Sequence, residues 1–346
     1  GATTLITHRI NSLGNDSAFE YIKSKMNHFG YITKGQTYSE TGKNLYVIKE
    51  GTQYSDKYFM LCAHYDVVAQ HCADDNASGV AGVLETARLC SELKFSYSII
   101  YAFWDEEEVG LIGSRHFAQY ADSMSMNIVG VLNFEMSGYD SDNDGLIDIH
   151  TRPINQSVQL ANTMYAVDSV YNIPLEPIIY NPGTGASDHS SFWRYDFSAI
   201  AFSEAYYGGD FNPFYHSSSD RIEQFNLPYF QNVVKLSVGT TATLANEGLT
   251  TSVKEDNRTV NFLLIKNFPN PFNNSTKLVY TLPSNTNLRI DLFNSLGQKI
   301  KTVLSDYQIS GKHSIDLTLD DISSGVYYVV LRTDDTIKAH KILLMK

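Results

Sequence analysis

The stretch Ser98-Ile99-Ile100-Tyr101-Ala102-Phe103-Trp104 runs directly into four consecutive acids, Asp105-Glu106-Glu107-Glu108. The first seven residues are mostly apolar and rich in β-formers, which predicts a short buried strand. Four neighbouring carboxylates repel one another and raise one another's pKa. A bound dication would remove that repulsion, whereas a solvated acidic turn is the alternative when the run is taken alone.

Other strand and helix patterns surround this segment. Strand-like runs lie at residues 44–49, 58–63 and 128–134, and helical patterns at 16–29, 76–91, 111–120 and 226–246. In the first helical pattern Asp16 is expected to act as the N-cap, and Phe19, Ile22, Met26 and Phe29 form one apolar stripe. Buried strands that alternate with helices predict an α/β fold with a central sheet.

The sequence pattern changes after residue 248. Residues 249–261 are polar without periodicity and predict a linker. Short alternating strand patterns follow, separated by turns such as Pro269-Asn270-Pro271, at residues 278–282, 288–293, 299–304, 313–317, 326–332 and 339–344. They predict a small all-β sandwich, immunoglobulin-like, over residues 262–346, after a catalytic domain over residues 1–248.

Charge is unevenly distributed along the chain. Residues 1–248 hold 14 Lys and Arg against 29 Asp and Glu, a net charge of −15, and the remainder carries +3. An acidic first part argues against nucleic-acid binding and suits metal ions or ammonium groups.

Cys62, Cys72 and Cys90 form no C-x₂-C pair, so zinc-binding thiolates are not expected, while a disulfide of Cys72 with either other cysteine stays open.

Polar residues follow several predicted strands. His64 and Asp66 follow one strand, Glu135 follows another, and Asp75 lies in a loop that opens a helix. Because ligands of open α/β sheets converge at the carboxyl ends of the strands, these groups and the acidic run are expected to meet at one edge. His216 and other polar residues lie further along the chain.

Residues 40–245 resemble the zinc aminopeptidase family that includes bacterial leucyl aminopeptidases. The matching pieces occur in the order His64-Tyr65-Asp66, Ala73-Asp74-Asp75-Asn76-Ala77-Ser78-Gly79, Glu107-Glu108-Val109-Gly110-Leu111 with Gly113-Ser114, Phe134-Glu135-Met136, Ser187-Asp188-His189, and His216 with Asp220. The resemblance implies a zinc exopeptidase fold, with a mixed sheet flanked by helices. It also implies an aminopeptidase that acts on peptides with a free N-terminus.

The resemblance assigns ligands for two zinc ions. Asp75 bridges both ions, His64 and Glu135 complete one set, and Glu108 and His216 complete the other. The family often has Asp where Glu135 stands, which leaves the ligation mode of this longer side chain open.

The remaining roles follow from the same resemblance and from the chemistry of metal-bound imidazole. Glu107 is implied as the general base. Metal-bound histidines usually donate their other N–H to a carboxylate or carbonyl, so Asp66 is expected beside the first histidine ligand. Asp188 and Asp220 are expected beside the second.

A second ion site is predicted at Asp140-Ser141-Asp142-Asn143-Asp144-Gly145, which matches the opening of a calcium loop. Asp148 adds an acid at position 9, but position 12 is Thr151, so the segment is not a full EF-hand. The sequence predicts one Ca²⁺ bound by Asp140, Asp142, Asp144 and Asp148, with an acidic surface turn as the alternative.

The tail resembles the C-terminal sorting domain of proteins exported by the type IX secretion system. The matching pieces are Asn267-Phe268-Pro269-Asn270-Pro271-Phe272-Asn273, Asp291-Leu292-Phe293-Asn294 with Gly297, Ser324-Gly325-Val326-Tyr327, and Lys341-Ile342-Leu343-Leu344-Met345-Lys346. This implies export across the outer membrane to a secreted or cell-surface location, with the secretion machinery as a partner. A permanent binding module is the alternative.

Three other functions are weighed against the aminopeptidase. The segment Cys62–Asp66 also fits a single-zinc, glutaminyl cyclase-like transferase, and carboxypeptidase or dipeptidase activity is a further option. A metal-free receptor domain of this fold would lack ligands, and none is lacking here. A large apolar substrate residue is expected from nearby apolar and aromatic side chains, namely Met136, Phe192, Trp193, Tyr206, Tyr207, Phe211, Phe214 and Tyr215.

Overall fold

The computed structural model describes residues 9, 12–249, 264–282, 285–295, 297–309, 311–320, 322–333 and 337–346. The chain forms two compact units, Gly1–Thr250 and Thr251–Lys346. Apart from residue 249, the predicted linker at 249–261 lies outside the described residues. The domain boundaries given above therefore stay a prediction.

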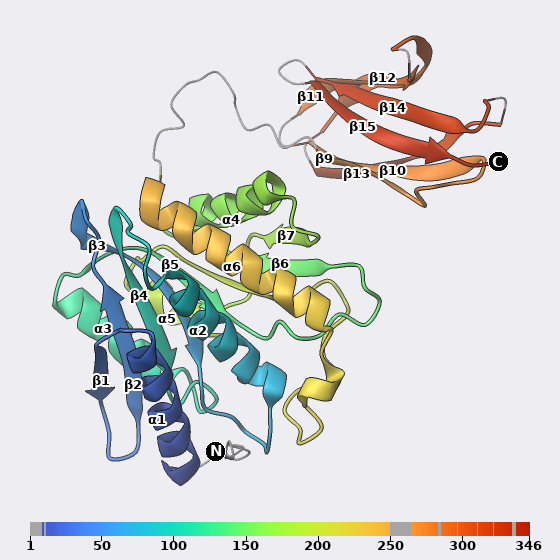
Figure 1. Ribbon diagram of the computed structural model, residues 1–346. Helices are drawn as coiled ribbons and strands as arrows, with labels where there is room; N and C mark the ends of the chain where they lie inside the picture. The colour runs from blue at the N-terminus through green and yellow to red at the C-terminus, as the bar shows by residue number, and fades with distance from the viewer. Residues whose placement is uncertain are drawn as a thin grey trace. The chain divides into compact units, whose positions relative to one another are not determined.

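The first unit is built around a sheet that has eight strands within the described residues (Figure 1). Their spatial order is β1 (Thr33–Thr37), β2 (Lys43–Lys49), β4 (Tyr97–Trp104), β3 (Tyr54–His64), β5 (Asn127–Phe134), β8 (Ala199–Glu204), β6 (Leu146–His150) and β7 (Glu176–Tyr180). The four central strands are mutually parallel, since β3 pairs in parallel with β4 and β5, and β5 with β8. Antiparallel pairing of β2 with β4 and of β6 with β8 makes the sheet mixed, as predicted.

Helices cover both faces of this sheet (Figure 1). One face carries α1 (Ser12–His28), α2 (Gly79–Cys90), α4 (Ser157–Tyr171) and α6 (Leu227–Glu247). The other carries α3 (Ile112–Ser123) and α5 (His189–Trp193). The predicted α/β fold class is therefore confirmed.

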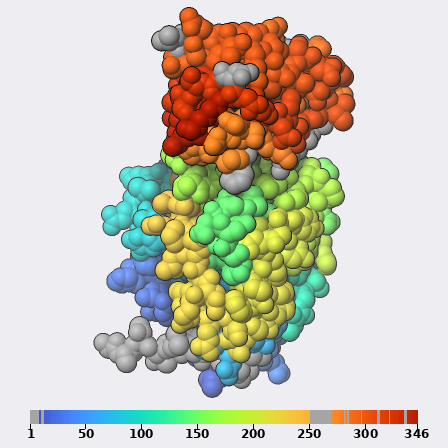
Figure 2. All heavy atoms as spheres, turned by 90° about the vertical axis from the view of Figure 1, so that its right-hand side faces the viewer, coloured from blue at the N-terminus to red at the C-terminus, as the bar shows by residue number. Residues whose placement is uncertain are grey.

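Two segments lie side by side on the surface near the carboxyl ends of the parallel strands. They are the loop between β5 and β6 and the residues that follow β8, which appear as adjoining green and yellow atoms in Figure 2. Ser141 in the first segment donates hydrogen bonds to Asp210 in the second, through its backbone N–H and its hydroxyl. Residues from both segments contribute to the site described below.

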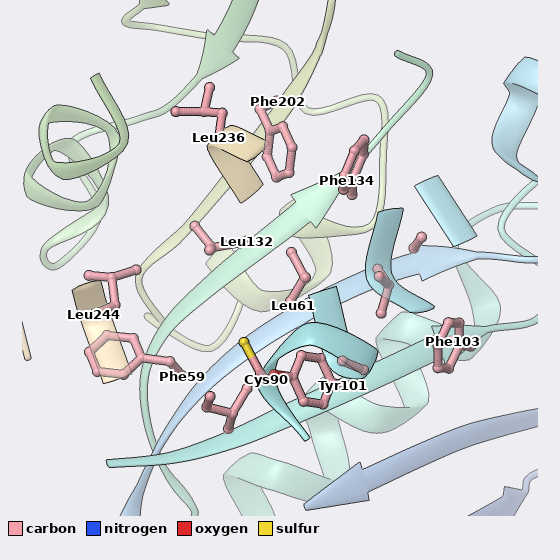
Figure 3. Packing of buried hydrophobic residues seen from close by; sticks show 14 of the residues in the cluster. Phe59, Leu61, Cys90, Tyr101, Phe103, Leu132, Phe134, Phe202, Leu236 and Leu244 are labelled. Carbon is pink, nitrogen blue, oxygen red and sulfur yellow. The ribbon is translucent and has the colours of Figure 1, made fainter. Parts of the chain in front are cut away.

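Alternation along the strands separates the core into two layers. Phe59 and Leu61 of β3 and Leu132 of β5 point toward α2 and α6, where they pack with Cys90 and Leu244 (Figure 3). The intervening residues of the same strands face α3 and α5 instead, among them Met60, Cys62 and Val131. Because helices bury both faces of the sheet, these strands read as continuous apolar runs in the sequence.

The first helix differs from the prediction at its start. It begins at Ser12, so Asp16 lies inside the helix and does not cap it. The Asp16 carboxylate instead pairs with the Lys43 ammonium. The predicted apolar stripe is correct, because Phe19, Ile22 and Met26 are buried in the core.

The second unit contains two antiparallel sheets over one core. One has the order β13 (Gly311–Thr318), β10 (Ser275–Leu282), β9 (Leu264–Phe268), and the other β12 (Lys299–Gln308), β11 (Thr286–Asn294), β14 (Gly325–Arg332), β15 (Ile337–Leu344). Leu278 and Leu317 of the first sheet pack with Ile290, Val329 and Ile342 of the second. All six predicted strands are present, and β9 is an additional one.

Candidate metal centre

The predicted ligands reach one place from five segments of the chain. His64 ends β3, Glu108 lies in the turn after β4, and Glu135 follows β5. Asp75 lies in a π-helical turn, Ala73–Ser78, that precedes α2, and His216 lies in the segment after β8. The parallel strands place their carboxyl ends at the same edge of the sheet, as the sequence predicted.

The Asp75 carboxylate lies between the two histidines. Its Oδ1 is 3.3 Å from His64 Nε2, and its Oδ2 is 3.2 Å from His216 Nε2. Glu135 Oε1 lies 3.4 Å from the same nitrogen of His64, and Glu108 Oε2 lies 3.1 Å from that of His216. The five side chains therefore form two groups of three that share Asp75.

Backbone geometry distinguishes the four acids that follow β4. Asp105 is buried and faces away from the ligands, where its carboxylate accepts hydrogen bonds from Asn15 and from the backbone N–H of Lys43. Glu106 has a positive φ of 56°, and its carboxylate accepts a hydrogen bond from Thr41. Glu107 and Glu108 both line the pocket that contains the ligands.

Asp66 supports three residues of the site. One carboxylate oxygen accepts the backbone N–H of Glu107 at 3.0 Å, and the other accepts that of Glu108 at 3.1 Å. Its Oδ1 is also 3.4 Å from His64 Nδ1. Asp66 thus stands beside the histidine named from the sequence and additionally fixes the backbone of the acidic run.

The two other predicted supporting residues contact further parts of the site. The Asp220 carboxylate accepts the backbone N–H groups of Asp74 and Asp75, and so holds the turn that carries the shared carboxylate. Asp188 is fully buried, and burial raises the pKa of its carboxyl to about 7, against the charge of His64. Its electrostatic neighbours are therefore on the His64 side of the site.

A short hydrogen-bond chain positions Glu135. Ser187 Oγ donates to Glu135 Oε2 at 2.6 Å, and Asn133 Nδ2 donates to Ser187 Oγ at 2.8 Å. Sequence reasoning gave neither residue this role. The signal available was the place of Asn133 two residues before Glu135, which puts both side chains on one face of a strand.

Sequence reasoning also missed the buried carboxyl pair of Asp74 and Glu204. The Asp74 carboxylate accepts the backbone N–H groups of Ser137 and Gly138 and the side chain of Asn212. Burial raises the pKa of Glu204 well above its usual range, and the adjacent charge of Asp74 adds to this. The pair is thereby favoured to hold a proton, and it ties the end of β8 to the turns that carry Asp75 and Glu135.

Arg9 provides the one buried guanidinium of this region among the described residues. It donates to the backbone carbonyls of Tyr65 and Cys72, on either side of the loop that follows His64. Burial lowers the pKa of Arg9, and the surrounding carboxylates counteract that effect. No motif in the sequence pointed to this residue.

Protonation in this centre is set by burial and by the mutual proximity of the groups. Although burial opposes it, hydrogen bonding with His216 and His64 lowers the pKa of Asp75. Burial raises the pKa of Glu108 to about 8, and the neighbouring Asp75 charge contributes. Burial also raises the pKa of Glu107 well above its usual range, against the charge of His64.

The donor set fits zinc. Imidazole nitrogens and carboxylate oxygens are ordinary zinc ligands, and a site with fewer than four protein ligands per ion leaves room for water or substrate. Glu108 Oε1 is buried without a hydrogen-bond partner among the described residues, which suits an oxygen that faces a cation. The three cysteines are free and buried, and none belongs to the ligand group.

The predicted calcium residues are only partly brought together. Ligand oxygens of Asp140, Asp142 and Asp144 lie within 4.8 Å of one another. Asp148 is not part of that group: it is buried on β6, where its Oδ2 accepts the backbone N–H of Tyr207. The fourth residue of the predicted calcium set is therefore separated from the other three.

Comparison with known proteins identifies both parts of the chain. Residues 44–241 match the family described as peptidase family M28. The chain belongs to peptidase family M28. Residues 266–345 of this M28 protein match the family described as secretion system C-terminal sorting domain. The two family assignments confirm both resemblances found in the sequence.

Individual relatives cover the catalytic part. Leupeptin-inactivating enzyme 1 of Streptomyces exfoliatus is 30% identical over 234 residues, which are 62% of this chain and 51% of that protein. The M28 protein therefore spans about half the length of this curated relative. The crystal structure of Legionella pneumophila LapA aminopeptidase aligns with a TM-score of 0.63 at 26% identity, covering 70% of this chain and 68% of that one.

A glutaminyl cyclase shares the fold. The structure of the Porphyromonas gingivalis enzyme aligns with a TM-score of 0.58 at 16% identity, covering 68% of this chain and 92% of that one. At this identity the likeness concerns the fold alone.

None of the helices in the described ranges combines the length and apolarity that crossing a membrane requires.

Zinc affinity of the metal-free M28 protein is expected to rise between pH 6 and pH 8. Zinc must displace the proton from Glu108, whose pKa is about 8, and from the two histidines, whose pKa values are raised by the surrounding carboxylates. Protons therefore compete less as the pH rises. Competition titrations with a chelator of known proton affinity measure this, and an affinity that is flat or falls over that range would contradict the assignment.

Proposed function

We propose that this M28 protein is an exported aminopeptidase that uses two zinc ions. The observation that carries the proposal is the Asp75 carboxylate, whose two oxygens face two different histidines, each with its own glutamate. One carboxylate shared between two such groups is what a pair of metal ions requires. His64, Asp75 and Glu135 would hold one ion, and His216, Asp75 and Glu108 the other.

Zinc at these positions would lower the pKa of a water and polarise the scissile carbonyl. The protein's own part falls to Glu107, which lines the pocket beside the ligands. Its raised pKa, set mainly by burial, suits a group that takes a proton from water and returns it to the leaving amine. Asp66 fixes the Glu107 backbone, so the base is held in place during both transfers.

A preference for a free N-terminus is proposed from the likeness to the Legionella pneumophila LapA aminopeptidase, at 26% identity. This favours an aminopeptidase over a carboxypeptidase. The full set of ligands favours either peptidase over a metal-free receptor.

The glutaminyl cyclase-like transferase remains the second candidate, because glutaminyl cyclases share the fold. The two groups of ligands that share Asp75 favour two metal ions, whereas the transferase would need only one zinc ion. Products separate the candidates, since the transferase releases ammonia and a cyclised N-terminus, while the aminopeptidase releases a free amino acid.

Export is proposed from the second unit. Its match to a secretion system sorting domain supports passage across the outer membrane by the type IX machinery, to a secreted or cell-surface location. Peptides outside the cell would then be the substrates. A permanent binding module is the alternative role for this unit.

We further propose that Asp140, Asp142 and Asp144 bind one Ca²⁺. Burial raises the pKa of Asp140 and of Asp144, and repulsion from neighbouring acids of the group adds to this. The loop contacts Asp210 and Asn226, so an ion there would stabilise the segments beside the metal centre.

Calcium is expected to raise the melting temperature of the zinc-loaded protein by a few degrees. Asp144→Asn should reduce that shift, since it removes a charge but keeps the oxygen that accepts the backbone N–H of Leu146. Thermal unfolding with CaCl₂ against NaCl of equal ionic strength is the measurement. An unchanged melting temperature in the wild type would leave the loop as an acidic surface turn.

Glu107→Gln and Glu108→Ala are expected to fail in different ways. Glu107→Gln should keep bound zinc and lose turnover of aminoacyl-nitroanilides by about 100-fold or more, because only the base is removed. Glu108→Ala should lose zinc occupancy, measured by elemental analysis.

Glu106→Gln is the matched control from the same acidic run. Its side chain contacts Thr41, so zinc content and turnover should both stay at the wild-type level. An active Glu107→Gln would show that the base is misassigned.

A further inference from the structure

The side chain of Arg9 joins two of the segments that carry the proposed zinc ligands. Its Nε donates to the carbonyl of Tyr65 at 2.9 Å, and Tyr65 directly follows His64. Its Nη2 donates at 3.0 Å to the carbonyl of Cys72, three residues before Asp75. Arg9 is only 9% exposed, so little water competes for these two hydrogen bonds.

The chain between these two carbonyls has no regular structure to hold it. Residues 65–72 form neither a helix nor a strand. His71 and Cys72 have φ values of 69° and 43°, in the left-handed region that residues with a Cβ rarely adopt. Such conformations persist only where surrounding contacts hold them. The hydrogen bond from Arg9 to the Cys72 carbonyl is one of these contacts.

The central sheet fixes His64 but does not contain Asp75. His64 is the last residue of β3 and is paired in register with β4. Asp75 lies in the turn Ala73–Ser78, outside the sheet, and its backbone N–H donates to the Asp220 carboxylate. Arg9 ties the residue before this turn to the residue after β3, and therefore acts on the separation of the two ligands.

A guanidinium suits this position for two reasons. Its N–H donors form a rigid planar fork, so two of its nitrogens reach carbonyls of different segments at once. Its positive charge also interacts favourably with the carboxylates of Asp66, Asp75 and Asp220. The same side chain thus bridges the backbone and offsets part of the repulsion among the acids.

We propose that Arg9 is a positioning residue that sets the separation of His64 and Asp75 and thereby raises the affinity of the centre for zinc. It acts through the backbone of two segments and is not itself a ligand. This inference rests on the two-zinc centre of the proposed function and names a residue that supports it.

The two proposed ions should depend on Arg9 to different degrees. The ion held by His64, Asp75 and Glu135 takes two ligands from the segments that Arg9 joins. The ion on the His216 side takes only Asp75 from them. A general loss of stability would weaken both ions alike, so a difference between the two is the signature of positioning.

The test measures zinc affinity of the metal-free protein by competition with a chelator, in two backgrounds that each keep one ion. His216→Ala keeps the ion beside His64, and His64→Ala keeps the other. Adding Arg9→Met should lower zinc affinity by about tenfold or more in the His216→Ala background, as loss of a group that supports metal ligands commonly does. In the His64→Ala background the loss should be clearly smaller.

Arg9→Lys separates the bridge from the charge. Its ammonium keeps the positive charge but has one nitrogen in place of the two that reach the carbonyls. Zinc affinity in the His216→Ala background should therefore fall with Arg9→Lys as well. This variant also carries the test if Arg9→Met does not fold, which the melting temperature shows.

Arg88→Met is the matched control. Arg88 is exposed on α2, where it pairs with Glu85, so zinc affinity in both backgrounds should stay at the level of the parent protein.

Equal losses of zinc affinity in the two backgrounds, unchanged affinity in Arg9→Met, or full affinity in Arg9→Lys would overturn this inference. Each of these results would leave the proposed function standing, provided that the wild type binds two zinc ions. A wild type that binds fewer than two zinc ions would instead overturn the proposed two-zinc centre.

Discussion

The shared Asp75 carboxylate is the interaction on which the site depends. Two histidines from distant parts of the chain approach its two oxygens, and every other ligand is placed relative to them. Desolvated carboxylates at such density repel one another, so the fold needs compensating groups around them. Asp220 and Asp66 hold the backbone of Asp75 and Glu107 in place by accepting hydrogen bonds from their N–H groups. The proposed cations would offset the negative charge of the carboxylates.

The support around Asp75 explains why so many polar groups are buried beside the sheet edge. Asp74 points away from the ligands and ties the same turn to the loop after Glu135. Ser187 holds the carboxylate of Glu135 by a hydrogen bond. Asp75 and Glu135 are thus each held by a hydrogen-bonding neighbour, which is the arrangement that metal sites need for a defined geometry.

Sequence reasoning found the fold class because the buried strands leave apolar runs in the sequence. The five proposed ligands came from the resemblance to the zinc aminopeptidases, and polar residues at strand ends gave independent support for His64, Glu108 and Glu135. Applied to the apolar run that ends in Glu204, the same rule would have found β8 and the buried carboxyl group at its end. The roles of Ser187 and Asp220 could not be read in this way, because they depend on which backbone groups the folded chain brings within reach.

The most direct test of the two-metal account is anomalous diffraction at the zinc edge from crystals of the zinc-loaded protein. The account predicts two anomalous peaks, about 3.5–4 Å apart, one on each side of the Asp75 carboxylate. One peak should be ligated by His64 and Glu135, and the other by His216 and Glu108. A single peak at full zinc occupancy, or a peak that Asp75 does not contact, would contradict it.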